Sequence, residues 1–440
     1  MAIPHLLSAH NSSMPPVREA ASLPAPAPRR RVPWWQRALL LAPPADLEAH
    51  NTRALYLDAA YGGMATNVAI YFLPVLAVRL GASDLEVGAL NAGPYLAGLL
   101  WSLPAGRMAG DRRHLLPVLL SSLSLYRFSC LLVALILLVL PRFQVEALVI
   151  LNSLAGIPFV TINIALYTLF AHVLSAERMA RVLSLRLAIT SLTSMLGLLL
   201  AGVWLEQAPF PFNYQVMFIA LFLIGMVNVW YFSRLRLLDQ GAPPRPQPAP
   251  SWRVRWQGLR RERRYLLFLT SATFLHLAIN AAAALYPIFV VNHLGASDGW
   301  VSLLLTIFTA TTFLGALWTE RFLQRWGTRH TLSVSMLGLG IYTIFLATAP
   351  SVPFLIPAHI LGGIMAAGFN VGLANGLVEY CPEEGRTDFV ALYMFLMNVA
   401  VFVGPLLGSA LSTAWDVVTA LLIVAALRVA SGLAFYLLKY

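Results

Sequence analysis

The chain has 440 residues and a formal net charge of +11 at pH 7, with 59% hydrophobic and only 11% charged residues. Soluble domains carry about 25% charged residues, so this composition excludes a soluble enzyme or binding domain. In a soluble protein such a basic balance would suggest a nucleic-acid partner. Basic loops explain it better in a membrane protein, and we expect no nucleic-acid partner here.

Apolar stretches recur along the chain between charged residues or Pro/Gly breaks, and each is close to the roughly 20 residues that cross a bilayer as a helix. We count about twelve, at 54–78, 86–105, 115–140, 144–172, 182–204, 212–233, 265–291, 299–318, 331–349, 353–378, 388–412 and 415–438. Helices are favoured because lipid offers no partner to backbone amides, and the alternating pattern of a membrane barrel is absent. The sequence therefore predicts an all-α, multi-pass membrane protein.

Two polar, proline-containing stretches divide the chain. Residues 1–49, rich in Pro, Ala and Arg, are predicted to be a disordered basic tail, and residues 237–263 an irregular linker. Six spans then fall in 50–236 and six in 264–440. Basic residues collect on one set of loops, so the positive-inside rule places both termini and the linker in the cytoplasm, and we expect the protein in the plasma membrane.

The two halves share sequence. Leu80-Gly81-Ala82-Ser83-Asp84 recurs letter for letter as Leu294-Gly295-Ala296-Ser297-Asp298. A second match, at an offset of 207, relates Leu154, Gly156, Ile157, Asn163 and Leu166 to Leu361, Gly363, Ile364, Asn370 and Leu373. Internal repeats of this kind are typical of transporters with a binding site between the halves.

The loops after the second and eighth spans are also alike. The first contains Gly106, Arg107, Gly110, Asp111, Arg112 and Arg113, and the second contains Arg321, Arg325, Gly327 and Arg329. Together with the spans, linker and repeat, they resemble the signature loops of the major facilitator superfamily over about residues 50–440. In the family's signature loop an aspartate precedes the second glycine. Here Asp111 follows Gly110, and Gln324 stands at the aspartate position of the second loop.

The resemblance implies two pseudo-symmetric six-helix halves and a cytoplasmic gate. The gate would comprise the loop residues above together with Glu177, Arg178, Arg181, Glu383, Glu384 and Arg386. Exposed ion pairs are worth about 0–1 kcal/mol each, so a gate made of them opens at low cost. Ordinary basic charge at helix ends is the alternative interpretation.

Polar residues at membrane depth are costly and usually face the interior of a bundle. Asn152 and Asn163 are eleven residues apart, as are His359 and Asn370, so each pair shares a helix face. In the resembling fold, spans 1, 4, 7 and 10 line the central cavity, which makes these four residues candidates for a substrate surface. Close helix packing with interhelical hydrogen bonds is the alternative.

Other intramembrane polar residues extend this set. Asn67, His276 and Asn280 are further cavity candidates on the first and seventh spans. Asp58 is a candidate for ion coupling or a structural partner for an arginine, although nine residues place it about 180° from Asn67 on an ideal helix.

Two arginines lie near the midpoints of predicted spans. Arg127 and Arg428 each need a partner in the bilayer, because an unpaired arginine there costs at least about 2.5–3.5 kcal/mol on insertion scales. We interpret both as structural pairs, with anion binding as the alternative.

We therefore predict a secondary transporter that moves a small-molecule substrate by alternating access between the halves. The chain has no nucleotide-phosphate loop, so an ion gradient, with protons as the candidate ion, would supply the energy. We expect a monomer without a cofactor or metal. The alternatives are a transporter-like sensor, or an intramembrane enzyme or lipid-handling protein, although no motif for metal or hydrolase chemistry is present.

Overall fold

The computed structural model describes residues 46–110, 112–238, 262–382 and 386–437, and these are helical with short turns. Most of the predicted tail and of the linker, together with Asp111, Glu383 and Glu384, lies outside the described residues. Within the described residues, ten helices are long and apolar enough to cross a membrane. One of these is a double span and α3 completes the set, which agrees with about twelve spans.

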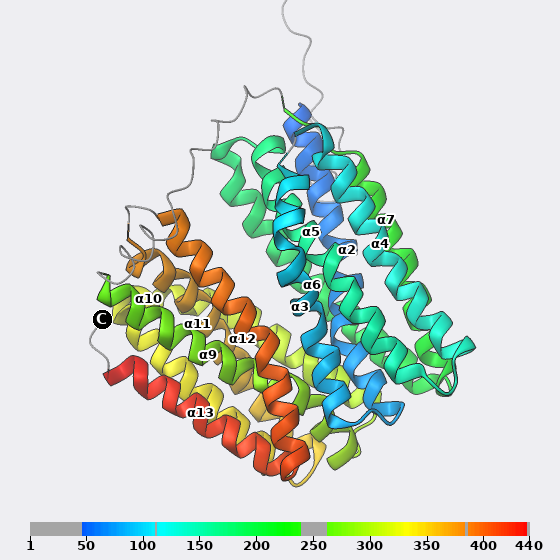
Figure 1. Cartoon of the computed structure of the whole chain (residues 1–440), viewed down its shortest axis with the longest axis vertical. Coiled ribbons are helices and arrows are strands. Elements are labelled where there is room, and N and C mark those ends of the chain that lie inside the picture. Colours follow the sequence, from blue (N-terminus) through cyan, green and yellow to red (C-terminus); the bar gives the residue numbers. More distant parts are fainter. Residues whose placement is uncertain (1–45, 111, 239–261, 383–385, 438–440) are drawn as a thin grey trace, which may run out of the picture. The chain divides into compact units, whose positions relative to one another are not determined.

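The first bundle contains six helices that run from blue to green in Figure 1. They are α2 (Leu47–Arg79), α3 (Asp84–Ala109), α4 (Arg112–Val139), α5 (Gln144–Val173), α6 (Ala176–Gln207) and α7 (Phe212–Ser233). Within it α2 packs on α6 and α7, α3 packs on α5, and α4 packs on α5 and α7.

The second bundle repeats this arrangement. It consists of α9 (Arg263–Pro287), the π-helical turn η1 (Ile288–His293), α10 (Asp298–Ala347), the 3-10 turn η2 (Val352–Phe354), α11 (Leu355–Tyr380), α12 (Arg386–Ala414) and α13 (Val417–Leu437). Here α10 packs on α11 and α13, and α9 packs on α12 and α13. Helices α3 and α6 of the first bundle contact α12 and α10 of the second.

The segment after the eighth predicted span is almost entirely helical, which corrects the prediction of a loop there. Helix α10 runs through this region and is interrupted at Gly327, whose φ of 77° lies in the left-handed region. Only glycine adopts that conformation at little cost. The chain therefore turns from one span into the next at a single residue.

The repeated Leu-Gly-Ala-Ser-Asp segment folds the same way in both halves. Gly81 and Gly295 have φ values of 86° and 64°, which terminates the preceding helix. The serine that follows caps the next helix, as Ser83 accepts from Glu86 N and Ser297 from Trp300 N. Each copy thus makes the tight turn at which one span ends and the next begins.

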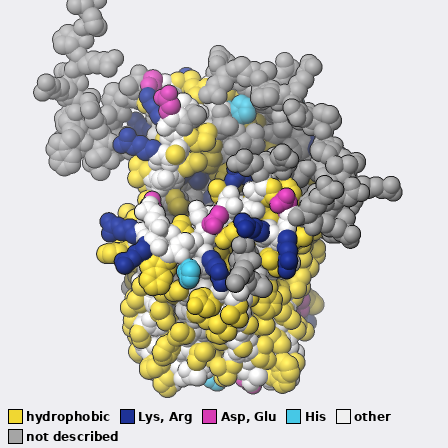
Figure 2. All heavy atoms as spheres, turned by 90° about the vertical axis from the view of Figure 1, so that its left-hand side faces the viewer, with side chains coloured by type: hydrophobic (Ala, Val, Ile, Leu, Met, Phe, Trp, Pro, Cys, Tyr) yellow, Lys and Arg dark blue, Asp and Glu magenta, His cyan; other side chains and the backbone are white. Residues whose placement is uncertain are grey.

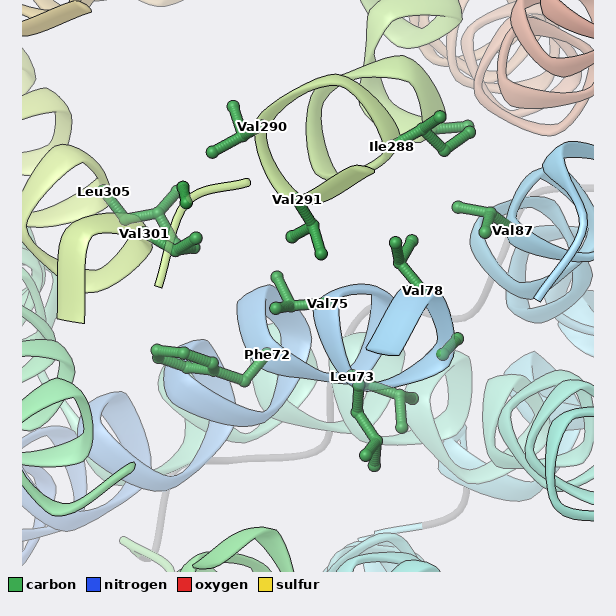
Figure 3. Close-up of a cluster of buried hydrophobic side chains, with 14 of the residues drawn as sticks. Phe72, Leu73, Val75, Val78, Val87, Ile288, Val290, Val291, Val301 and Leu305 are labelled. Atoms are coloured by element: carbon green, nitrogen blue, oxygen red, sulfur yellow. The ribbon is translucent and has the colours of Figure 1, made fainter. Parts of the chain in front are cut away.

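Buried apolar side chains join the two bundles near these turns. Val75 and Val78 of α2 lie opposite Val291 of η1, and Val301 and Leu305 of α10 belong to the same cluster (Figure 3). On the face shown in Figure 2, arginine side chains gather toward one end and the surface below is almost entirely hydrophobic. That distribution suits a protein surrounded by lipid with a basic end in water.

Candidate functional site

A cavity of about 530 Å³ lies between the two bundles, a size typical of small-molecule sites. We call it the central cavity. Helices α2 and α3 contribute one wall, and α9 to α13 contribute the other. Its wall is mostly apolar and aromatic, with polar groups at Asn91, Asn280, Thr343, His359, Asn370 and Arg428 and with tyrosines at positions 71, 95, 286 and 342.

Hydrogen bonds fix several of these polar side chains in place. His359 is 1% exposed, with Nδ1 2.8 Å from the Leu355 carbonyl oxygen and Nε2 3.1 Å from the Tyr286 hydroxyl. Asn280 donates to the His276 carbonyl oxygen at 2.8 Å. Asn370, in contrast, is exposed on the cavity wall. The cavity therefore offers a preformed polar wall on α9 and α11 with one accessible amide.

Arg428 on α13 is buried beside the cavity and holds three helices together. Its guanidinium donates to the Ala278, Ile279 and Leu339 carbonyl oxygens and, at 2.6 Å, to the Thr343 hydroxyl. Its described partners are neutral oxygens and not a carboxylate. Backbone carbonyl oxygens are among the partners that arginines at membrane depth take.

Polar contacts cross between the bundles at the turns 80–83 and 294–297, which we call the closed end. Arg79 donates to Asp298 at 3.2 Å and to the Ala296 carbonyl oxygen, and Tyr214 donates to Asp298 at 2.9 Å. Further pairs also join the bundles here: Gly299 N with Glu206, Ser302 with the Leu198 carbonyl oxygen, and Ser412 with Asp84. This end of the central cavity is therefore sealed by both polar and apolar contacts.

A second cavity, of about 280 Å³, lies inside the first bundle. A buried charge cluster, which consists of Asp58, Arg127, Arg186 and Asn228, lines it. Arg186 donates to one oxygen of Asp58 from Nε at 3.1 Å and from Nη2 at 2.7 Å. Asn228 donates to the other Asp58 oxygen and accepts from Arg127 at 3.0 Å, and Arg127 also donates to Thr66 at 2.9 Å.

The predicted substrate residues divide among three places. His359, Asn370 and Asn280 line the central cavity, whereas Asn67 and Asn163 line the first-bundle cavity. Asn152 donates to the Leu90 carbonyl oxygen of α3 at 2.8 Å beside a pocket of about 40 Å³. The structure thus brings together Asn280 of α9 with His359 and Asn370 of α11, whereas the α9 candidate His276 is not among the lining residues. It separates these three from the candidates on α2 and α5.

Asp58 and Asn67 do not point apart as the ideal helix predicts. Both line the first-bundle cavity, and both contact α6, Asp58 through Arg186 and Asn67 through Ser194 at 2.6 Å. An angle on a helical wheel gives only the direction of the Cα–Cβ bond. The long side chain of Arg186 extends from α6 to Asp58, so Asp58 contacts α6 although the wheel places it about 180° from Asn67.

Two glycines and a histidine near these faces serve packing. A Cβ on Gly156 would lie 2.1 Å from the Pro94 carbonyl oxygen, and one on Gly363 would lie 2.0 Å from the Thr311 hydroxyl. Close packing, the alternative considered for these positions, therefore fits both glycines. His276 packs edge-on against Phe369, and its buried Nε2 has no hydrogen-bond partner in the described part of the chain.

Several predicted gate residues make contacts within their own bundle. Arg178 pairs with Asp46 at 3.6 Å and Glu48 at 3.4 Å, Arg329 donates to the Phe435 carbonyl oxygen at 3.0 Å, and Arg386 donates to Val378. The side chains of Glu177, Arg181, Arg107, Arg321 and Arg325 are exposed. Arg112 and Arg113 start α4, but their side chains lie outside the described part of the structure.

Arg186, Asn228 and the Arg79–Asp298 pair were not among the functional residues predicted from the sequence. Arg186 carried a usable signal, because it is the only charged residue in the predicted span 182–204 and a charged residue at that depth needs a partner. Arg79 also stood out, as it directly precedes the first copy of the repeated segment. Asn228 carried a weaker signal, since an amide within a span is usual.

Comparison with known proteins agrees with this architecture. The family model described as Major Facilitator Superfamily matches residues 59–282 and 268–440. Among solved structures, the nucleoside transporter NupG superposes with a TM-score of 0.64 at 16% identity, covering 90% of this chain and 100% of that one. A bacterial homolog of the human lysosomal transporter Spinster, in an inward-facing conformation, gives 0.67 at 12% identity over 89% and 95% of the two chains. At these identities the likeness establishes the fold alone.

Curated sequences match over shorter stretches. The MFS antiporter QDR3 of Candida albicans is 29% identical over 127 residues, which are 29% of this chain and 18% of that protein. The staphylopine export protein of Staphylococcus aureus is 22% identical over 129 residues, which are 29% of this chain and 32% of that protein. The matches thus span about a third or less of either relative.

Proposed function

The chain belongs to the major facilitator superfamily, and we propose that this membrane transporter is a secondary active carrier that moves a small solute by alternating access. The observation that carries the proposal is the central cavity of about 530 Å³ between the bundles, sealed at one end by contacts that cross from one bundle to the other. A site between two repeats with a seal on one side suits a carrier that opens alternately to each side.

The transport step would consist of a change in how the bundles contact each other. Opening the closed end requires Arg79 to leave Asp298 and the Ala296 carbonyl oxygen, and the apolar contact of α2 with η1 to separate (Figure 3). Bonds of this kind are re-formed with water at modest cost. The predicted gate residues at the opposite, basic end would then make the contacts that close that side.

The basic end gives the proposed orientation. Arg107 lies in the last turn of α3, and the exposed Arg321 and Arg325 precede the break of α10 at Gly327. By the positive-inside rule this end would lie in the cytoplasm. The closed end would then face the outside, with the termini and the linker in the cytoplasm. We propose that the protein acts as a monomer in the plasma membrane.

Ion coupling would use the buried charge cluster. Asp58 is 2% exposed and bonded to Arg186 and Asn228, and a proton on Asp58 would remove its ion pair with Arg186. A carboxyl group whose protonation breaks an interhelical bond can couple a proton to a change of helix packing. Asp58→Asn is expected to abolish accumulation driven by a pH gradient and to leave downhill exchange of solute measurable.

Solute screening and a matched pair of variants test the central cavity. Nucleosides, named for the similar structure NupG, are the first candidates for thermal stabilisation of the purified protein, followed by uptake into proteoliposomes. D-xylose is the second candidate, because the solved structure of a D-xylose-proton symporter is also similar, with a TM-score of 0.62 at 14% identity. Asn370→Ala should weaken the response at least about tenfold, because it removes the accessible amide. Asn398→Ala removes an exposed amide of α12 bonded within its own helix to Met394 and should not change it. Equal responses in both variants would refute the assignment of this cavity.

A further inference from the structure

The first-bundle cavity contains more positive than negative charge. Of the described residues that line it, Asp58 is the only carboxylate, whereas Arg127 and Arg186 are both cationic. One positive charge is therefore left over in a bundle that the lipid surrounds. An unmatched charge at this depth is costly, which makes the cavity attractive to a counter-ion.

The hydrogen bonds show that Arg127 is the cation without a charged hydrogen-bond partner among the described residues. Arg127 is 2% exposed, and its Nη1 and Nη2 bond the neutral oxygens of Thr66 and Asn228. Its Nε has no hydrogen-bond partner among the described residues. Asn228 separates Arg127 from Asp58, so the carboxylate does not contact that guanidinium directly. In the described structure the hydrogen bonds of Arg127 therefore go to neutral oxygens, and the Asp58 carboxylate acts on its charge only through space.

Arg186 has donor capacity left as well. Its Nε and Nη2 both bond the same oxygen of Asp58, and within the described chain Nη1 makes no hydrogen bond. Its side chain is 22% exposed while that of Asp58 is 2% exposed. The open side of the ion pair is therefore the guanidinium, on the wall of a cavity large enough to admit a small ion.

Polar neighbours without a charge complete the cavity wall. Asn67 and Asn163 line the same cavity, Asn67 donating to Ser194 and Asn163 to the Phe159 carbonyl oxygen. Tyr126 lies beside Arg127, with its ring 5.6 Å from the guanidinium carbon. Planar guanidinium groups are well suited to carboxylates and other anions.

We propose that this cavity is an anion site, separate from the central cavity, which takes one monovalent anion on Arg127 and Arg186. Its chemistry suits a carboxylate or a halide, either as a free ion or as the anionic group of the transported solute. The inference depends on the proposed function only where the anion belongs to a transported solute, because the protein must then carry that solute.

Thermal unfolding of the purified full chain in detergent tests the site. Sodium chloride, acetate and benzoate are titrated against sodium gluconate at constant ionic strength, and wild type is expected to show a saturable stabilisation. Arg186→Gln leaves the cluster neutral and should weaken the apparent affinity roughly tenfold or more. Arg142→Gln, which removes an exposed arginine from the α4–α5 turn, should titrate like wild type and corrects for general salt effects.

A second variant guards against simple misfolding of Arg186→Gln. Asp58→Asn removes the only carboxylate of the cluster and should tighten anion binding roughly tenfold, a gain that loss of structure cannot produce. Stabilisation by chloride and acetate indicates a free ion, and stabilisation by benzoate alone indicates the anionic group of a solute. No saturable effect, or an Asp58→Asn response that is weaker than wild type, would overturn the proposal.

The two proposals fail separately. If wild type transports a solute into proteoliposomes but no anion stabilises it, the anion site is wrong and the carrier stands. If anions bind saturably and no solute is transported in any direction, the carrier is wrong and the anion site stands.

Discussion

The seal at the closed end gives the most direct test of alternating access. Asp298→Asn removes the negative charge that Arg79 approaches at 3.2 Å and leaves the side chain almost unchanged in size. Tyr214, which donates to the same oxygen at 2.9 Å, would then face a neutral amide. The change is confined to one of the contacts that cross between the bundles.

The structure sets the size of the effect. Hydrogen bonds to charged groups contribute about 1.5–3 kcal/mol when buried, and exposed ion pairs about 0–1 kcal/mol. The Arg79 and Asp298 side chains are 26% and 10% exposed, which places this pair between the two cases, at about 1.5 kcal/mol. Because about 1.4 kcal/mol changes an equilibrium tenfold, the population with this end open should rise roughly tenfold.

Distances between spin labels measure that population. Labels at Leu85 of α3 and Asn292 of η1, both exposed at the closed end, would be introduced after replacing Cys130 and Cys381 with serine. Asp298→Asn should increase the fraction of long distances. An unchanged distance distribution would show that this pair does not hold the bundles together and would refute the reasoning.

Asp416→Asn is the matched control, because it neutralises an acid at the same end. Asp416 bonds Thr419 and Val418 of its own bundle, and hydrogen bonds from the Thr419 side chain and from the Thr419 and Val418 backbone amides keep the pKa of Asp416 below its usual value. It is therefore ionised at neutral pH, and the two variants lose the same charge. A shift of equal size in Asp416→Asn would assign the effect to general electrostatics.

Two further predictions concern stability, measured as thermal unfolding in detergent. Gly156→Ala should destabilise the protein by about 1–3 kcal/mol, because its new methyl group would meet the backbone of Pro94, whereas Gly106→Ala has open space and should be close to neutral. Asn51→Ala should cost about 3 kcal/mol, because this fully buried amide makes three hydrogen bonds to the backbones of Val173 and Arg236. A smaller loss for either than for Gly106→Ala would contradict the packing described.

The helical framework could be predicted because lipid leaves the chain few choices. A backbone surrounded by hydrocarbon must bond to itself, so apolar length alone located the spans. The repeated segment was equally informative, since Gly81 and Gly295 both adopt positive φ and the serines after them both cap helices. What the pattern did not reveal was that Gly327 alone turns α10, because the surrounding residues read as a basic loop.

The candidate site was less predictable because a shared helix face does not imply a shared cavity. Eleven residues span about 16 Å along a helix, so Asn152 and Asn163 meet different neighbours despite their common direction. His359 and Asn370 have the same spacing, yet both reach the central cavity because it extends along α11. Periodicity gives orientation, whereas depth depends on how the neighbouring helices cross.

The partners of the buried charges also could not be predicted from the sequence. A single sequence shows that Asp58, Arg127 and Arg186 each need a partner, but it does not show which helices meet. Two arginines and one carboxylate permit several pairings. The packing of α2 against α6 and α7 decides the pairing. It brings Arg186 into contact with Asp58 and places Asn228 between Asp58 and Arg127.

The two halves share a helical scaffold but carry different functional side chains. The repeated turns and the glycine contacts of α5 and α11 correspond, because both bundles must pack helices closely. The polar groups do not correspond, since most of those on the central-cavity wall come from the second bundle, whereas the charge cluster lies wholly in the first. A carrier in which one bundle supplies most of the solute contacts and the other holds the charges can couple the two only through their relative movement. Such coupling would therefore make or break the Arg79–Asp298 contact, which joins the bundles.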